Sequence, residues 1–154
     1  ANYLKCSTAP IYFNFSTVDE LKEEIINMCK EKLKKYLFGN YSKRKILNGA
    51  IGFVIFAREE KELFKTIFLD TTERFEKLYE ETLRELLTKE NLLESFPALE
   101  EDEAKNAVNK IWYFLFGYAT MLCTRLDDNY RKNETNEIIE NKIEDIVKHF
   151  KMQI

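Results

Sequence analysis

The chain has 154 residues, of which 45% are hydrophobic and 33% are charged. This balance is typical of a globular protein with one core, and it excludes a fibrous or intrinsically disordered chain. Only four glycines and two prolines interrupt the sequence, so long helices are expected. Cys6, Cys29 and Cys123 are widely separated, which indicates neither a disulfide framework nor a zinc site and favours a reduced, cytoplasmic protein.

The formal net charge of −3 hides a gradient along the chain. Residues 1–45 carry nine Lys and Arg against five Asp and Glu, a balance of +4, whereas the remaining residues carry −7. A basic beginning fits a protein that touches phosphate at one end only, although charge scattered without function gives the same counts. The longest apolar run, Ile111 to Cys123, is too short for a membrane span, so no membrane partner is expected.

Two helices are expected in the first 40 residues. Ser7 is positioned to cap a short helix that ends near Phe15. The segment Thr17-Val18-Asp19-Glu20 is a capping box, which predicts a longer helix from Thr17 to about Tyr36. One face of that helix is apolar and consists of Leu21, Ile25, Met28, Cys29, Leu33 and Leu37.

Three helices are expected in the middle of the chain. The segment 42–58 is apolar nearly all round, which predicts a central and buried helix. Shorter helices are expected over residues 59–69 and 75–89, with a turn at residues 70–72 between them.

Two further helices close the chain, on either side of a polar loop at residues 127–135. The first contains the apolar run 111–123. In the second, Ile139, Ile143, Ile146 and Phe150 are spaced four, three and four residues apart, which is typical of a seam between helices. The pattern as a whole predicts an all-α helical bundle.

The segment CSTAPIYFNFSTVDEL, residues 6–21, resembles the recognition-helix signature of TetR-family transcriptional regulators. The similarity rests on Ser7, Ala9, the pair Ile11-Tyr12, Phe15, the cap at Thr17 and the anchor Leu21. An ordinary amphipathic turn and helix is the alternative interpretation. The resemblance implies that DNA is contacted by Ser7, Thr8, Ala9, Tyr12, Phe13 and Asn14.

The sequence departs from the family pattern in two ways. Val18 stands where many family members have a Lys that grips phosphate. The family also has a first helix and most of a second helix before the signature, and these would precede residue 1. The resemblance therefore implies the end of a helix-turn-helix at 1–16, a ligand-binding and dimerisation domain at 17–154, and operator binding only when the earlier helices are present.

The later part of the chain is similar to the family more loosely, through FVIFAREEKELFKTIF (53–68) and IWYFLFGYATMLC (111–123). In the family, the last two helices of two subunits form a four-helix bundle, which implies a homodimer. A monomer that buries both helices internally is the alternative. The expected interface residues are Ile111, Leu115, Leu122, Ile139, Ile143, Ile146 and Phe150.

Aromatic residues make up 14% of the chain, and several recur on neighbouring helices. Such helices either enclose an apolar cavity for a small molecule or form a fully packed core. We expect a cavity lined by Phe53, Phe56, Phe75, Tyr79, Trp112, Tyr113 and Phe116.

The sequence gives no support for catalysis. The only histidine, His149, lies in the last turn of the last helix, and no nucleophile–base pair, phosphate loop or metal-ligand spacing is present. We therefore expect no enzyme, cofactor or metal. Together with the resemblance, the sequence predicts a DNA-binding transcriptional repressor that a small, largely apolar inducer releases from operator DNA. The alternative is a helical dimerisation module that senses nothing.

Overall fold

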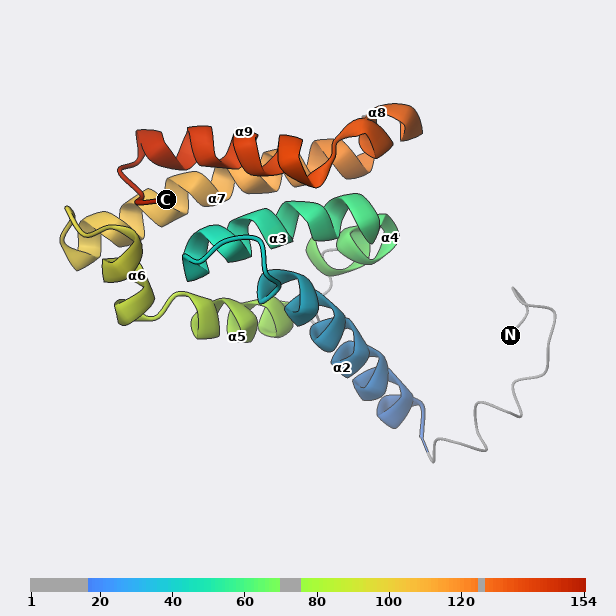
Figure 1. The fold of residues 1–154 in the computed structure, drawn as a ribbon. Helices are drawn as coiled ribbons and strands as arrows, with labels where there is room; N and C mark the ends of the chain where they lie inside the picture. Colours follow the sequence, from blue (N-terminus) through green and yellow to red (C-terminus); the bar gives the residue numbers. More distant parts are fainter. Residues whose placement is uncertain (1–16, 70–75, 125–126) are drawn as a thin grey trace.

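A computed structural model describes residues 17–69, 76–124 and 127–154, with the side chains of residues 76–79 left out. In these residues the chain is helical and contains no strand, so the predicted all-α class is confirmed. Figure 1 shows α3 in the middle of the molecule, with α9 and α7 on one side of it and α5 on the other. Among the described helices, none is long and apolar enough to cross a membrane.

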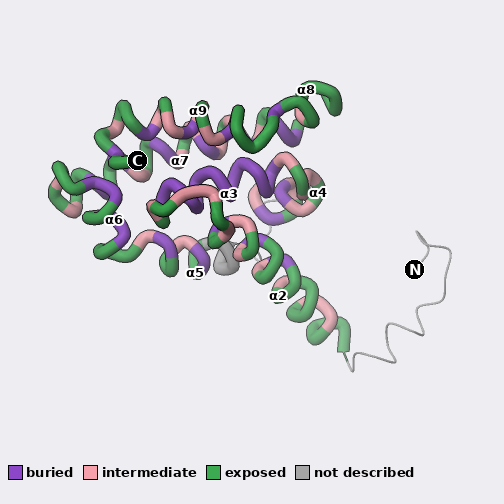
Figure 2. Tube along the Cα trace, in the orientation of Figure 1, coloured by how far each residue is buried: buried purple, intermediate pink, exposed green. Residues whose placement is uncertain are grey.

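Helix α2, Val18–Leu37, begins as the capping box predicts. Thr17 has extended backbone, and its hydroxyl accepts a hydrogen bond of 3.1 Å from the Glu20 backbone N–H. The predicted apolar face is buried only in the second half of the helix, because the first half projects away from the body (Figures 1 and 2). Ile25 and Met28 are accordingly 46% and 65% exposed, which corrects the expectation of one continuous buried face.

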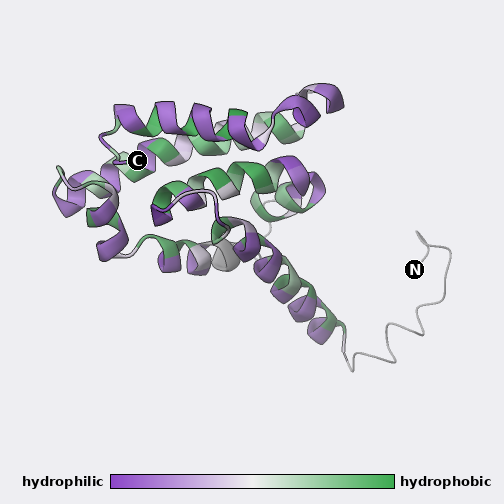
Figure 3. Cartoon of the chain, viewed as in Figure 1, coloured by the Kyte–Doolittle hydropathy of each residue, from purple (hydrophilic) through white to green (hydrophobic). Residues whose placement is uncertain are grey.

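Helix α3, Lys45–Glu59, is the centre of the core, as the sequence predicts. It contacts α2, α5, α6, α7 and α9, and twelve consecutive residues from Ile46 to Ala57 are buried. Figure 3 shows it as the most uniformly hydrophobic helix of the fold. Gly52 allows α2 to approach this closely, because a Cβ atom there would lie 2.0 Å from the Tyr36 carbonyl oxygen.

The segment after α3 is less regular than the sequence predicts. A single helix was expected over residues 59–69, but α4, Lys61–Phe64, gives way to a π-helical turn, Lys65–Leu69. The expected turn at residues 70–72 lies outside the described residues. Helix α5, Glu76–Leu86, follows, and then α6, Lys89–Ser95, a short helix that Thr88 caps by accepting from the Asn91 N–H and that we did not expect.

Three helices complete the chain: α7, Glu101–Thr124; α8, Asp128–Asn133; and α9, Asn136–His149. The predicted loop at residues 127–135 is corrected here, because the Asp127 carboxylate accepts from the Tyr130 N–H at 2.7 Å and caps α8. Thr135 caps α9 in the same way through the Ile138 N–H.

Two buried asparagines fix the ends of α2 and α5. The Asn48 side chain donates to the Leu37 carbonyl at 3.0 Å and accepts from the backbone N–H groups of Tyr41 and Ser42. Asn91 donates to the Leu86 carbonyl at 2.7 Å. Each amide satisfies a carbonyl that a helix end leaves unpaired, so both connections are held by specific hydrogen bonds.

Candidate functional site

A cavity of about 220 Å³ lies between α2, α3, α5 and α7. It is smaller than four other hollows among the described residues and less open to solvent than they are. Its walls are almost entirely apolar, and they consist of Leu37, Gly49, Ala50, Phe53, Leu83, Leu86, Leu87, Val108, Asn109 and Trp112. A concave, mostly apolar space with one or two polar groups has the usual character of a small-molecule site.

Small residues of α3 form one wall of this space. Gly49 and Ala50 both lie on that wall, and a larger side chain at Ala50 would occupy part of the hollow. At Gly49 the neighbouring space is already taken by Leu86 of α5, because a Cβ atom there would lie 2.4 Å from the Leu86 Cδ2 atom. Gly49 therefore lets α5 pack closely against α3 beside the cavity.

Aromatic rings form the remaining wall. The ring centroids of Phe53 and Trp112 lie 5.0 Å apart at a tilt of 47°. Behind them, Phe68 packs edge-on against Phe53 at 5.1 Å, and Phe116 contacts Trp112 at 5.8 Å. Ring pairs of this kind stabilise a structure beyond the area they bury, so this wall is fixed by its own packing.

The structure brings together only part of the predicted pocket. Phe53 and Trp112 line the cavity, whereas Phe56 is buried against Tyr36 and Phe64, and Phe116 lies behind Trp112. The prediction that Tyr113 lines the cavity is wrong, because its side chain is 75% exposed and does not belong to the lining. Phe75 lies outside the described residues, and so does the side chain of Tyr79.

Sequence reasoning missed most of the aliphatic wall. Leu83 and Leu86 come from α5, Leu87 directly follows that helix, and Val108 comes from α7. Leu83 and Leu86 repeat with helical spacing, and the small residues Gly49 and Ala50 of α3 lie opposite them on the cavity wall. A pair of small residues in an otherwise bulky apolar helix was a signal that α5 packs closely at this point.

A second hollow, of about 460 Å³, lies on the outside of the molecule between α7 and α9. We call it the outer groove. Its lining includes Phe114, Tyr118 and Met121 of α7, together with Tyr130 of α8 and Lys142 of α9. Phe114, Tyr118 and Met121 repeat at intervals of four and three residues, so they share one face of α7. This face is turned away from the cavity.

A charged network lies under the outer groove. The Glu134 carboxylate is buried, accepts a short hydrogen bond from the Tyr118 hydroxyl, and accepts two hydrogen bonds of 2.8 Å from Lys142 Nζ. Burial raises the pKa of Glu134, but the hydrogen bonds from Lys142 and Tyr118 outweigh it and hold the pKa below its usual value. Arg58 adds a hydrogen bond of 2.6 Å to the Glu134 carbonyl.

The predicted interface residues lie mainly inside the chain. Ile111, Leu115, Leu122, Ile139 and Ile143 are buried in its own core, because α3 packs against both α7 and α9. The prediction that these five side chains form an interface with a second subunit is therefore corrected: they form a contact between helices of the same chain. The other two predicted residues, Ile146 and Phe150, are half-buried, and Ile146 lines the outer groove.

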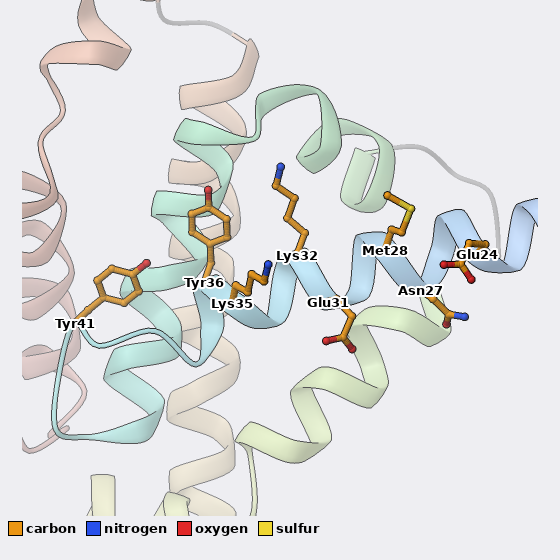
Figure 4. A pocket seen from close by; sticks show the side chains of 8 residues that line it. All are labelled: Glu24, Asn27, Met28, Glu31, Lys32, Lys35, Tyr36 and Tyr41. Atoms are coloured by element: carbon orange, nitrogen blue, oxygen red, sulfur yellow. The ribbon is translucent and has the colours of Figure 1, made fainter. Parts of the chain in front are cut away.

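A third hollow runs along α2 and is shown in Figure 4. Its described lining residues come only from α2 and the following connection, where Tyr41 lies. In Figure 4, Met28, Lys32 and Tyr36 lie on one side of the helix, whereas Glu31 and Asn27 lie on the other. Its charged lining residues are Glu24 and Glu31 followed by Lys32 and Lys35, so this surface is a solvated helix rather than an enclosing site.

The predicted DNA-contacting residues, Ser7 to Asn14, lie outside the described residues. In the described part of the chain, no group of three or more His, Cys, Asp or Glu could hold a metal ion. Cys123 donates from its thiol to the Ala57 carbonyl, and burial raises its pKa to about 11, so it is a packed thiol at neutral pH.

Comparison of the chain with protein-family models, with characterised proteins and with solved structures gives no significant match. The cavity and the outer groove are therefore interpreted from their own geometry.

Proposed function

We propose that this chain is the sensing and dimerising part of a TetR-type transcriptional repressor. The repressor dissociates from operator DNA when it binds a small apolar inducer. The observation that carries the proposal is the apolar, partly open cavity of about 220 Å³ between α2, α3, α5 and α7. The resemblance of residues 6–21 to a recognition helix supports the DNA-binding side of the proposal.

The contacts of α2 provide a route from the cavity to the beginning of the chain. Leu37, at the end of α2, lines the cavity. Two ion pairs join α2 to α5: Lys30 pairs with Glu81, and Lys34 pairs with Glu85 at 2.6 Å. Because α5 also supplies part of the cavity wall, an inducer that displaces α5 changes the direction of α2.

The outer groove supports the homodimer. It exposes aromatic and apolar side chains on α7 and α9, the two helices that pair between subunits in the family. Lys142 and Asp145 carry opposite charges in the same groove. In a two-fold dimer each patch meets its own copy, so a patch that carries both charges does not repel itself.

Ligand-dependent stabilisation tests the sensing part of the proposal. The melting temperature is measured with a broad library of small molecules for the wild type and for Ala50→Leu, which fills the cavity. Ala98→Leu is the matched control, because Ala98 is exposed and distant from the lining residues. A ligand should stabilise the wild type and the control by mass action and leave Ala50→Leu unchanged.

The coupling to α2 is measured by amide hydrogen exchange with a stabilising ligand. We expect altered exchange in α2 as well as around the cavity. Stabilisation without any change in α2 would mean that the chain binds a ligand but does not transmit the event.

A dimerisation module without a ligand is the second candidate function, and the outer groove is the observation that favours it. Sedimentation equilibrium of Met121→Glu tests the dimer face, with Asn106→Glu, an exposed residue on the same helix, as control. Loss of the dimer in Met121→Glu, combined with a flat response to the whole library, would favour the module over the sensor.

A further inference from the structure

The cavity walls carry no ionisable side chain among the described residues. On the helices that form two of the walls, Lys34 of α2 and Glu85 of α5 are partly exposed and paired with each other. An ion placed in such a space loses its hydration and gains no opposite charge in return. The described part of the walls therefore favours neutral molecules over organic cations and anions.

The volume of the cavity limits the size of its occupant. An apolar cavity of about 150 Å³ in another protein holds benzene. The present cavity is about 220 Å³, so a single ring with a short substituent or two fused small rings fits. The tilted rings of Phe53 and Trp112 offer faces and edges for contact with an aromatic occupant.

Asn109 adds one polar group to this site. Among the described lining residues it is the one with a side-chain amide, and it is exposed. A side-chain amide both donates and accepts, so it can orient a neutral hydroxyl or carbonyl group at the edge of the cavity without attracting charge.

We infer that the cavity binds an uncharged, largely aromatic molecule of about eight to twelve non-hydrogen atoms, with at most one neutral hydrogen-bonding group directed to Asn109, and that it rejects organic ions of the same shape. This inference rests on the proposed function, because it names the class of ligand that the proposed sensor detects.

Four compounds of similar size separate the classes: ethylbenzene and benzyl alcohol are neutral, benzylammonium is a cation, and phenylacetate is an anion. Trp112 is the only tryptophan of the chain and lies in the cavity wall, so its fluorescence reports binding directly. We expect both neutral compounds to bind, and both ions to bind weaker by a factor on the order of 30.

Two variants test the site. Ala50→Leu should abolish the response to both neutral compounds, whereas Ala98→Leu should retain it. Asn109→Leu lies on an exposed position and keeps the fold, so it gives a second readout. This variant should weaken the binding of benzyl alcohol by about five-fold, as expected for the loss of a single neutral hydrogen bond. The binding of ethylbenzene, which makes no such bond, should be unchanged.

The outcomes distinguish this inference from the proposed function. If benzylammonium or phenylacetate binds as tightly as ethylbenzene and Ala50→Leu still blocks binding, the ligand class is wrong while the sensor proposal stands. If none of the four compounds changes the Trp112 fluorescence, the inferred ligand class is also wrong. The sensor proposal is contradicted by a different result, namely that no compound of the broad library raises the melting temperature of the wild type.

Discussion

The two faces of α7 contribute to two very different hollows. On one face, Val108 and Trp112 line the cavity, where no charged side chain is found among the described residues. On the other face, Phe114 and Tyr118 line the outer groove, which is about twice as large and lies over the Glu134–Lys142 network. The larger hollow is therefore the poorer candidate for a small apolar ligand, because enclosure and freedom from charge matter more than volume.

The largest expected effect is on the free energy of unfolding, and it compares a glycine in the tight contact between α3 and α2 with a glycine on the exposed face of α7. Gly52→Leu places atoms against the Tyr36 carbonyl, which is backbone and cannot move aside, so we expect a loss of about 3 kcal/mol in the free energy of unfolding. Gly117→Ala is the counterpart on α7, where nothing lies within 4 Å of an added Cβ atom, and it should gain about 0.5–1 kcal/mol. Urea denaturation measures both changes, and equal effects at the two glycines would contradict the contrast.

The next effect concerns the charged network of the outer groove. Glu134→Ala leaves the Tyr118 hydroxyl and Lys142 without their acceptor in a partly buried site, so we expect a loss of about 2 kcal/mol in the free energy of unfolding. Glu23→Ala, at an exposed position on α2, is the control and should change stability by less than about 0.5 kcal/mol. A similar small effect for both variants would show that the network contributes little.

A smaller effect is the dependence of stability on pH. The hydrogen bonds to Glu134 hold its pKa below the usual 4.5, so its ionised form is favoured by folding. This contribution is fully present above the unfolded pKa and is lost as the pH falls through the lower folded pKa.

Comparison of the wild type with Glu134→Gln isolates that contribution, because glutamine does not titrate. Chemical denaturation between pH 6 and pH 3, a range of about three units chosen to cross the unfolded pKa, should show that the wild type loses more stability on acidification than the variant. Parallel pH profiles would indicate that the Glu134 carboxyl has the same pKa in the folded and unfolded chain.

The smallest effect is expected from the ion pairs between α2 and α5, which lie at the surface. Lys34→Glu should cost at most about 1 kcal/mol, and the added Glu85→Lys should restore most of that loss by reversing the pair. A double-mutant cycle in urea denaturation measures the coupling. If the cycle gives no coupling, α5 and α2 are not linked through this pair.

The sequence was sufficient to predict most of the helices, since their caps and apolar periodicity are local features. Thr17 and the uniformly apolar α3 are the strongest examples. The short helices α6 and α8 were missed because each is held by a single capping side chain, Thr88 or Asp127, in a polar stretch that also fits a loop.

The candidate site was harder to predict than the fold. Helical spacing identifies which residues of α7 are apolar, but it does not indicate which face meets the same chain and which face remains open. Ile111 and Leu115 were therefore predicted to contact a second subunit, whereas they are buried in a helix that packs on α3 of the same chain. Tyr113 was predicted to line the cavity, whereas it is exposed. The cavity itself depends on how α2, α3, α5 and α7 meet in space, and the periodicity of single helices does not show this arrangement.

The hydrogen bonds of Asn48 have a mechanical consequence for α2. They anchor the Leu37 end of the helix, so this end acts as a fulcrum, and no residue from Val18 to Met28 is buried at the opposite end. Lys30, which is tied to α5, is seven residues from the fulcrum, and Val18 is nineteen residues from it. For a rigid rod with a constant rise per residue, a sideways displacement at Lys30 is therefore magnified about three-fold at the start of the helix.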